Sequence, residues 1–553
     1  MQRTVWSASS VAIAAVVACA LAPARPAAQA ASAAAEVDRV FARFTAATPG
    51  CAVGVGLDGA PVLARGYGTA DLEHDVPIGP DTIFEAGSVS KQFTAAAVMA
   101  LVQDGALSLD DPVRKYIPEL PDYGTPLTIR HMLTHTSGLR DWGSLAGIAG
   151  WPRTTRVHTH AHVLEIVGRQ KATNFVPGTH WSYSNTGYNL AAILVGRVSG
   201  QSFADFTKAR LFDPLGMTKT SWRDDHTRIV KGRAIGYDET DGVFHTDMPF
   251  ETVHGNGGLL TTVGDLLRWT EHLQHPASGD AAAVAAMQTP TAFSDGTGHG
   301  YGLGLMLDTR RGVRQIDHSG STAGYLAHLV RYPDQGVAVA VLCNVDSAAA
   351  TQKAYEVADV YLARKTTLAP PITARYTLTA QDVGTIEGLY RSRLDGRPVA
   401  IVRDGASVRI ERGPVLHAQS ATRFQTASGQ TWTFDGHGHV RSSDRYDVVD
   451  YDRVPPAAPS AAALAALAGR YTSDEIETTL GVVVEGGTLV VTRRPDTRLP
   501  LTPAYADAFT APGLGLVIVR RDAAGAVTAL SVVQDRVWDL RFERQPAGAD
   551  PSR

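Results

Sequence analysis

The sequence predicts an α/β domain followed by two small all-β domains, and three observations support this class. Strand-like segments open and close residues 31–368, whereas the stretch between about residues 107 and 269 has mostly helical patterning. After "ARKTTLAPP" the chain changes to short alternating strands separated by turns. This last region also repeats itself, in two units of about 80 residues.

The first element, residues 1–30, has the features of a secretory signal peptide. It carries Arg3, an apolar run over residues 11–21 and an A-x-A cleavage site at residues 28–30. The run is too short to span a bilayer, and no later stretch resembles a transmembrane helix. We therefore expect an exported, periplasmic or secreted protein. Because "VVAC" ends at Cys19 in the pattern of a lipoprotein signal, a lipid-anchored form is the alternative.

Residues 31–368 form the predicted α/β domain. Residues 37–48 have the pattern of an amphipathic helix, and Asp58-Gly59 marks the turn of a hairpin. The segments "YGLGLMLD", "GVRQIDHSG" and "AHLVRYPDQGVAVAVLCNV" return to strands near the end of the domain. Since strands occur at both ends, we expect one sheet completed by the two ends, with the helical portion inserted or packed on its face.

Two cysteines, Cys51 and Cys343, remain after removal of the leader, and both lie in apolar strand-like runs. The interpretation that we favour is two small buried hydrophobic side chains. A disulfide is the alternative in an exported protein, and it requires the two Cα atoms to lie within about 7 Å.

Residues 380–455 and 460–547 are the two predicted all-β domains. The segment "GLYRS" at residues 388–392 matches "GRYTS" at residues 469–473, and "YDRVP" later in the first unit matches "FERQP" in the second. Period-2 strands in units of this size indicate small antiparallel barrels or sandwiches. The segment "VPPAAPSAAA" from Val454 is the expected linker between them.

The charge of the chain excludes one class of partner. The formal net charge is −4 and there is no basic run, so we expect no nucleic acid partner. Only eight of the 51 basic residues are lysines, which makes the position of each lysine informative.

Ser88 and Lys91 stand at the start of an apolar helix in "FEAGSVSKQFTAAAVMALVQDG". Positions i and i+3 share a helix face, so Lys91 Nζ can reach Ser88 Oγ. A buried lysine that loses its proton can activate the serine as a nucleophile, and unpaired N–H groups at the helix start favour an oxyanion. None of the other seven lysines has a serine three residues earlier. The alternative is that Ser88 caps the helix and Lys91 is solvated.

A second candidate motif is Tyr183-Ser184-Asn185, the only Y-x-N of the chain, on a loop that enters a helix. A tyrosine there can pass a proton to a leaving group when a lysine lowers its pKa, and the asparagine can hold Lys91 or a substrate carbonyl. The alternative is a packed tyrosine in a helix-capping loop.

The third candidate motif is His318-Ser319-Gly320, the only H-x-G of the chain. Glycine at this position lets a substrate backbone lie close to a strand, and the N–H of Ser321 can donate to an oxyanion. A histidine with a purely structural role is the alternative.

The order S-x-x-K, Y-x-N, H-x-G resembles the serine β-lactamase and penicillin-binding protein superfamily in its class C-like branch. The segments "LTIRHMLTHTSGL", "GNGGLLTTVGDLLRW" and "YGLGL" are similar to that branch, and the whole architecture is similar to the D-aminopeptidases within it. The resemblance implies an α/β catalytic domain with an antiparallel sheet, followed by two antiparallel β-barrels. The resemblance also implies that Ser88 is the nucleophile and that Lys91 and Tyr183 are the acid–base pair. It implies that the substrate contacts are Asn185, His318 and Gly320. The backbone N–H groups of Ser88 and Ser321 would form the oxyanion hole.

The chain departs from many members of the superfamily at the third motif, which is H-S-G instead of K-T-G. A lysine is a permanent cation for a substrate carboxylate, whereas a histidine near its usual pKa of about 6.5 is mostly neutral at pH 7. The departure favours substrates whose carboxylate is absent or recognised elsewhere.

We therefore expect an exported serine hydrolase that forms an acyl-enzyme on a small peptide, amide or ester and needs no cofactor or metal. A D-aminopeptidase is the favoured activity, and an esterase or β-lactamase of the same superfamily is the alternative. A non-catalytic scaffold or binding protein on this fold is the alternative from another class. A metal site at the three histidines of "VHTHAHVLEIV" is less favoured than a solvated helix start.

The second all-β domain contains "TRRPDTRLPLTPAYADAF", residues 492–509, which we interpret as an ordered surface loop. In the D-aminopeptidases that the chain resembles, a loop of the last barrel enters the catalytic cleft. We therefore expect residues 493–501 to border the Ser88 cleft and to select small substrates.

Overall fold

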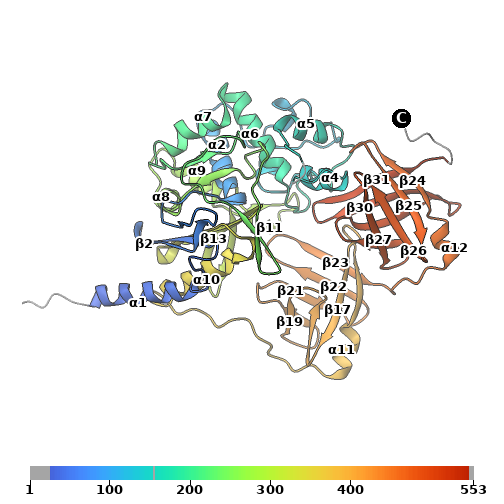
Figure 1. The fold of residues 1–553 in the computed structure, drawn as a ribbon. Helices are drawn as coiled ribbons and strands as arrows, with labels where there is room; N and C mark the ends of the chain where they lie inside the picture. Colours follow the sequence, from blue (N-terminus) through green and yellow to red (C-terminus); the bar gives the residue numbers. More distant parts are fainter. Residues whose placement is uncertain (1–24, 154–155, 547–553) are drawn as a thin grey trace, which may run out of the picture.

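The computed structural model describes residues 25–153 and 156–546 (Figure 1). Most of the predicted leader, with Arg3 and Cys19, therefore lies outside the described residues. The predicted cleavage site at residues 28–30 falls within helix α1 (Arg25–Val40). Within the described part of the chain, no helix combines the length and the apolar character needed to cross a bilayer.

The α/β domain is built on one antiparallel sheet of six strands in the order β12-β13-β14-β15-β1-β2. The N-terminal strands are β1 (Cys51–Leu57) and β2 (Ala60–Tyr67), and β1 pairs with β15 (Val337–Cys343) from the other end of the domain. The expectation that the two ends complete one sheet is therefore confirmed. The other three strands are β12 (Met306–Arg310), β13 (Val313–Thr322) and β14 (Tyr325–Tyr332).

Cys51 and Cys343 form a disulfide, so the interpretation of two unpaired buried cysteines is wrong. The register of β1 and β15 places the two residues directly opposite each other, with their Cα atoms 4.0 Å apart. The sequence alone could not show this register, because the partner strands lie 292 residues apart along the chain.

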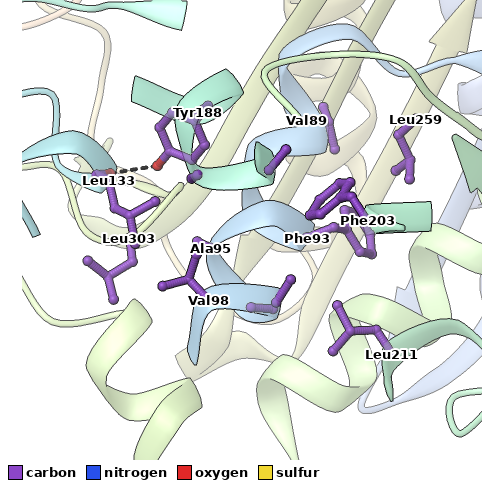
Figure 2. Packing of buried hydrophobic residues seen from close by; sticks show 14 of the residues in the cluster. Val89, Phe93, Ala95, Val98, Leu133, Tyr188, Phe203, Leu211, Leu259 and Leu303 are labelled. Carbon is purple, nitrogen blue, oxygen red and sulfur yellow. Dashed lines mark hydrogen bonds between the residues drawn. The ribbon is translucent and has the colours of Figure 1, made fainter. Parts of the chain in front are cut away.

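Helices cover both faces of the sheet. The alternation of side chains along β1 directs Val53 and Val55 to a core shared with α1 and α10 (Ala350–Leu362), and Ala52 to the opposite core. The second core contains α2 (Ser90–Gln103), α6 (Asn185–Ser199) and α8 (Val263–Gln274). Figure 2 shows the packing of this core around Val89 and Phe93.

The second core includes a polar contact that joins two helices. The Tyr188 hydroxyl of α6 donates to the Leu133 carbonyl at 2.5 Å (Figure 2). The remaining helices and short strands of the domain surround this core: β3 (Thr69–Asp71), β4 (Val76–Pro77), β5 (Phe84–Glu85), α3 (Ile129–Leu133), α4 (Trp142–Ile148), α5 (His160–Gly168), α7 (Phe203–Thr207), β6 (Ser221–Trp222), β7 (Tyr237–Thr240), β8 (Val243–Thr246), β9 (Leu259–Thr261), α9 (Ala281–Met287), β10 (Thr291–Ala292) and β11 (Gly298–His299).

Both C-terminal units are closed antiparallel barrels. Of the two predicted alternatives, barrels are confirmed and sandwiches are not. The first follows α11 (Ala380–Ile386) and consists of β16 (Gly388–Ser392), β17 (Pro398–Asp404), β18 (Ser407–Ile410), β19 (Val415–Ala418), β20 (Arg423–Gln425), β21 (Thr431–Phe434), β22 (His439–Ser443) and β23 (Val448–Arg453). The second follows α12 (Ala461–Ala465) and consists of β24 (Gly469–Ser473), β25 (Thr478–Glu485), β26 (Thr488–Arg493), β27 (Thr497–Pro503), β28 (Ala508–Ala511), β29 (Gly515–Arg521), β30 (Val527–Gln534) and β31 (Val537–Arg544).

The sequence repeat maps onto equivalent strands of the two barrels. The segment "GLYRS" is β16 and "GRYTS" is β24, the first strand of each barrel. The segments "YDRVP" and "FERQP" overlap the ends of the last strands, β23 and β31. The turn between β22 and β23 is therefore equivalent to the turn between β30 and β31.

Residues 492–509 do not form a surface loop, so that interpretation is wrong. They belong mainly to β26, β27 and β28, with a tight turn at residues 494–496. The prolines and arginines of this segment hid the alternation of apolar and polar residues that is typical of a strand. Exposed barrel strands accept both residue types on their outer face.

The second barrel packs against the helices of the α/β domain (Figure 1). Leu145 and Ile148 of α4 belong to the hydrophobic core of that barrel. Beside them, Arg140 and Glu475 form an ion pair at 2.8 Å, with side chains only 2% and 6% exposed. These buried contacts fix the second barrel beside the segment that leads into α4.

Candidate active site

Ser88 lies on a one-turn 3₁₀ helix, residues 87–89, between β5 and α2. This turn lies against β13 at a distance that only glycines permit. A Cβ atom on Gly320 would lie 2.0 Å from the Ala86 carbonyl oxygen, and a Cβ on Gly87 would lie 2.5 Å from the Ser321 nitrogen. Gly87 also has a φ of +48°, which L-residues rarely adopt. The glycine of H-S-G thus brings the serine turn and the backbone of Ser321 together.

Lys91 extends from the first turn of α2 toward Ser88. Its Nζ lies 3.1 Å from Ser88 Oγ, 2.9 Å from Asn185 Oδ1 and 2.7 Å from the Asn256 carbonyl oxygen. The side chain is fully buried. Burial, and next the positive charge of Arg536, hold the pKa of Lys91 well below its usual value of 10.5. No carboxylate among the described residues lies within ion-pair distance of Lys91.

The three contacts of Lys91 determine which way its lone pair points. A neutral amine has two N–H groups, and two carbonyl-type oxygens, from Asn185 and Asn256, accept them. The remaining direction faces Ser88 Oγ. The lone pair of neutral Lys91 is therefore directed at the serine hydroxyl, which is the arrangement of a general base.

Tyr183 and Asn185 come from the segment that enters α6. The Asn185 N–H donates to Asp141 Oδ2 at 2.8 Å, and Asp141 Oδ1 accepts from the Ser144 N–H of α4 at 2.9 Å. One buried carboxylate thus satisfies the starts of two helices and holds Asn185 toward Lys91. Lys91 Nζ lies 4.7 Å from the centre of the Tyr183 ring. Burial raises the pKa of Tyr183 above its usual 10, while its contact with Ser88 acts in the opposite direction.

His318 is only 1% exposed, and both of its ring nitrogens have partners. Nδ1 lies 2.6 Å from the Ser319 carbonyl oxygen, which can only accept, so Nδ1 carries the proton. Nε2 then accepts from the Tyr301 hydroxyl at 3.0 Å. Burial, and next the charge of Lys91, lower the pKa of His318 to about 3. His318 is therefore neutral, and it reaches the site through Tyr301.

The chain of hydrogen bonds continues from Tyr301 to His135. His135 Nδ1 accepts from the Ser184 N–H at 3.2 Å, so its protonated Nε2 donates to the Tyr301 oxygen, also at 3.2 Å. Burial also holds the pKa of His135 well below its usual 6.5. Two neutral histidines and one tyrosine thus connect H-S-G to the loop that carries Tyr183.

Several residues of the site had not been identified from the sequence. Asn256 contacts Lys91 and lies in "GNGGLLTTVGDLLRW", which had been noted only for its resemblance, whereas Asp141, which contacts Asn185, had not been noted. Arg536 comes from the second barrel, and its guanidinium carbon lies 4.6 Å from the centre of the Tyr183 ring. Residues 493–501, which had been expected at the cleft, include Arg493 and Arg494, which bind carbonyl oxygens at the end of α4.

The three histidines of "VHTHAHVLEIV" do not converge. His160 contacts the His254 backbone, and His162 Nδ1 accepts from the N-cap of α5. Among the described residues, the only cluster with metal-ligating geometry is Asp71, Glu73 and His74, on the surface hairpin of β3 and β4.

Comparison with known proteins identifies the family. Residues 37–362 match the family model described as Beta-lactamase, so the chain belongs to this family and is a serine hydrolase related to β-lactamases. It is 27% identical to a D-aminopeptidase of Brucella ovis over 506 residues, which cover 88% of this chain and 93% of the relative. A D-aminopeptidase of Brucella anthropi is 26% identical over 500 residues, with the same coverage of both chains.

Solved structures show the same fold. An octameric penicillin-binding protein homologue from Pyrococcus abyssi aligns with a TM-score of 0.54 and 24% identity, over 86% of this chain and 99% of that one. A D-amino acid amidase from Ochrobactrum anthropi aligns with a TM-score of 0.51 and 24% identity, over 60% of this chain and 99% of that one.

Proposed function

We propose that the protein is a D-aminopeptidase that cleaves small peptides or amides through an acyl-enzyme on Ser88. The observation that carries this proposal is the position of Lys91, whose Nζ lies 3.1 Å from Ser88 Oγ and also donates to the oxygens of Asn185 and Asn256. The activity itself is suggested by the relatives named D-aminopeptidase, which match 88% of this chain.

In the first step, Ser88 Oγ transfers its proton to Lys91 Nζ and attacks the carbonyl carbon of the substrate. The new C–O bond leaves an oxyanion on the substrate. The N–H groups of Ser88 and Ser321 stabilise it, because the serine turn adjoins strand β13 at Gly87 and Gly320. Asn185 Oδ1 and the Asn256 carbonyl oxygen hold the resulting ammonium of Lys91.

In the second step, the C–N bond breaks and the departing nitrogen takes a proton from the Tyr183 hydroxyl. The raised pKa of Tyr183 keeps this hydroxyl protonated until then, and Lys91 returns a proton to the phenolate. A water molecule then attacks the ester, with Lys91 and Tyr183 again moving the protons, and Ser88 is released.

An esterase or β-lactamase is the second candidate, since the same acyl-enzyme chemistry serves both. The observation that favours an esterase is the buried, neutral His318, which presents no cation to a substrate carboxylate at the position of K-T-G. A non-catalytic binding protein is disfavoured by the complete set of contacts around Lys91.

Export from the cytoplasm is part of the proposal. It is supported by the Cys51–Cys343 disulfide, a bond that is rare in reducing compartments, and by the leader-like residues 1–30. A lipid anchor at Cys19 is the alternative location, and mass spectrometry of the mature N-terminus from the native host separates the two.

The activity is tested with D-alanine p-nitroanilide, its L-enantiomer, a p-nitrophenyl ester and a chromogenic cephalosporin. We expect turnover of the D-anilide above the other three, and intact-mass and peptide mapping should place a slow acylating inhibitor on Ser88. Ser88→Ala should abolish turnover and the adduct while leaving the thermal midpoint unchanged, since Ser88 is partly exposed and lies outside the hydrophobic core. An adduct on another residue, or an active alanine variant, would refute the mechanism.

A further inference from the structure

Arg536 lies at the tip of the β30–β31 hairpin, and the second barrel thereby places a cation inside the catalytic site of another domain. The guanidinium carbon is 4.6 Å from the centre of the Tyr183 ring. After burial, the positive charge of Arg536 is also the largest influence that lowers the pKa of Lys91. The hairpin is equivalent to the β22–β23 hairpin of the first barrel, which carries Tyr446 and Asp447 at its tip.

The backbone of this tip is fixed to the catalytic domain. The Arg536 carbonyl oxygen accepts from the Asp141 N–H and from Asn174 Nδ2, both at 3.1 Å. Asp141 in turn accepts from the Asn185 N–H. The backbone of Arg536 is therefore connected through Asp141 to Asn185, the partner of Lys91, and it needs no rearrangement to keep the arginine at the site.

Arg536 is partly exposed, and in the described part of the chain its guanidinium has no acidic partner. No carboxylate among the described residues lies within ion-pair distance of it, although its neighbour Asp535 pairs with Arg397 at 2.8 Å. Ser88 and Tyr183 are also partly exposed, whereas Lys91, Asn185 and His318 are buried. The residues that a substrate can reach at this point are thus the nucleophile, the tyrosine and the arginine.

The position of Arg536 beside Tyr183 places it near the leaving-group end of a bound substrate. In the mechanism above, the departing nitrogen must come within hydrogen-bond distance of the Tyr183 hydroxyl. If that nitrogen belongs to an amino acid, its carboxyl carbon lies about 2.5 Å away, two bonds further along. A carboxylate there falls beside the guanidinium over the Tyr183 ring, and Arg is the side chain best suited to bind it.

We propose that Arg536 binds the free carboxylate of the leaving amino acid, so that the preferred substrates are dipeptides whose second residue ends in a carboxylate. The arginine from the barrel thereby supplies the cation that is absent from H-S-G. This inference rests on the proposed acyl-enzyme function and adds the class of leaving group to it.

The test uses two substrates that differ only in this charge, D-alanyl-D-alanine and D-alanyl-D-alaninamide, with cleavage of the peptide bond followed by mass spectrometry. The full-length wild type should have a kcat/KM at least about 10-fold higher on the acid. Arg536→Gln should lower kcat/KM on the acid by roughly 10- to 100-fold more than on the amide, and Arg536→Lys should retain part of the preference. The matched control is Arg498→Gln, an exposed arginine of the same barrel, which should leave both values unchanged.

The possible results separate the two proposals. Equal losses on acid and amide in Arg536→Gln would overturn the inference, because Arg536 would then act through Lys91 or the hairpin. A wild type that is acylated on Ser88 and cleaves anilides or esters, but shows no preference for the acid, would also overturn it. A wild type without a Ser88 adduct or any hydrolysis would instead refute the proposed function on which the inference rests.

Discussion

Trp181 of the α/β domain stacks on Tyr446 of the first barrel, with ring centres 4.3 Å apart and planes inclined by 11°. Two residues further along, Tyr183 is covered by Arg536 of the second barrel. Tyr446 and Arg536 occupy the equivalent turn of their barrels, β22–β23 and β30–β31. The duplicated unit therefore presents the same turn twice, against neighbouring aromatic residues of one segment.

This arrangement makes both barrels part of the wall of the site. In the first barrel, Asp447 accepts from the Trp181 N–H at 3.1 Å and lies 3.2 Å from His180 Nδ1. In the second barrel, the Arg536 carbonyl oxygen accepts from Asp141. The first barrel thus holds the segment that carries Tyr183 directly, and the second barrel holds it through Asp141, which accepts from the Asn185 N–H, and through the contact of Arg536 with the Tyr183 ring.

The first prediction concerns Lys91. Lys91→Met should lower kcat about 10²- to 10⁴-fold, because Ser88 loses its general base. Acylation by the wild type should also fall at low pH. The pKa of Lys91 lies well below 10.5 because the amine is buried, and the amine must be neutral to accept a proton. Stopped-flow acylation across pH measures both effects. Lys231→Met, at an exposed lysine, is the control, and an active Lys91→Met would contradict the assignment.

The second prediction concerns His318. His318→Lys places an ammonium in a buried site beside Lys91, without an acidic partner to replace the Tyr301 contact. We expect a loss of roughly 3–5 kcal/mol in the free energy of unfolding and no improved acylation by cephalosporins. Urea unfolding and cephalosporin kinetics measure the two effects. A stable His318→Lys that is acylated faster would show that position 318 reads substrate charge directly.

The sequence predicted the parts of the site that lie close together in the chain or follow a family pattern. Ser88 and Lys91 are three residues apart on a helical turn, and local geometry was enough to bring them together. Arg536 could not be predicted, because a barrel turn 353 residues beyond Tyr183 is placed by the docking of folded domains. For the same reason, the sequence could not show that Arg493 and Arg494 of the predicted barrel contact the end of α4.

The third prediction concerns the Trp181–Tyr446 stack. Tyr446→Ala should weaken the hold of the first barrel on this segment, at a cost of roughly 0.5–1.5 kcal/mol for the aromatic pair. We expect a higher KM with a smaller change in kcat, because the Lys91 contacts do not involve Tyr446. Steady-state kinetics on the D-anilide measure this. Tyr446→Phe retains the ring and should behave as the wild type; a phenylalanine variant as impaired as the alanine variant would argue against stacking.

The fourth prediction concerns the Arg140–Glu475 ion pair. Glu475→Gln leaves the buried guanidinium without its carboxylate and should cost roughly 3–5 kcal/mol. The double variant Arg140→Met, Glu475→Met should recover much of this loss, because neither charge remains buried alone. Urea unfolding of the single variants Arg140→Met and Glu475→Met and of the double variant measures the coupling. Additive effects of the two single methionine substitutions would show that the pair does not join the domains.

The ion pair also bears on a simpler experiment, the removal of residues 460–553. This truncation takes away Glu475 and the core that covers Leu145 and Ile148, so we expect it to destabilise the α/β domain. Point variants at Arg536 are therefore the better test of whether the second barrel selects substrates.

The last prediction concerns the acid sensitivity of the fold. The pKa of His318 is lowered to about 3 and that of His135 lies well below 6.5, chiefly because both rings are buried. Between about pH 3 and the unfolded value of about 6.5, the unfolded chain binds protons that the folded protein does not, so stability falls as pH decreases through 6.5. For His318 alone the loss between pH 7.5 and 5 is about 2 kcal/mol. Most carboxylates remain ionised in this range and do not obscure the effect.

Urea unfolding at pH 7.5, 6 and 5 should show the decline in the wild type and a shallower decline in His318→Asn. His437→Asn, at an exposed histidine, should keep the wild-type slope. A wild type equally stable at pH 7.5 and 5 would mean that His318 and His135 are not held neutral by the fold.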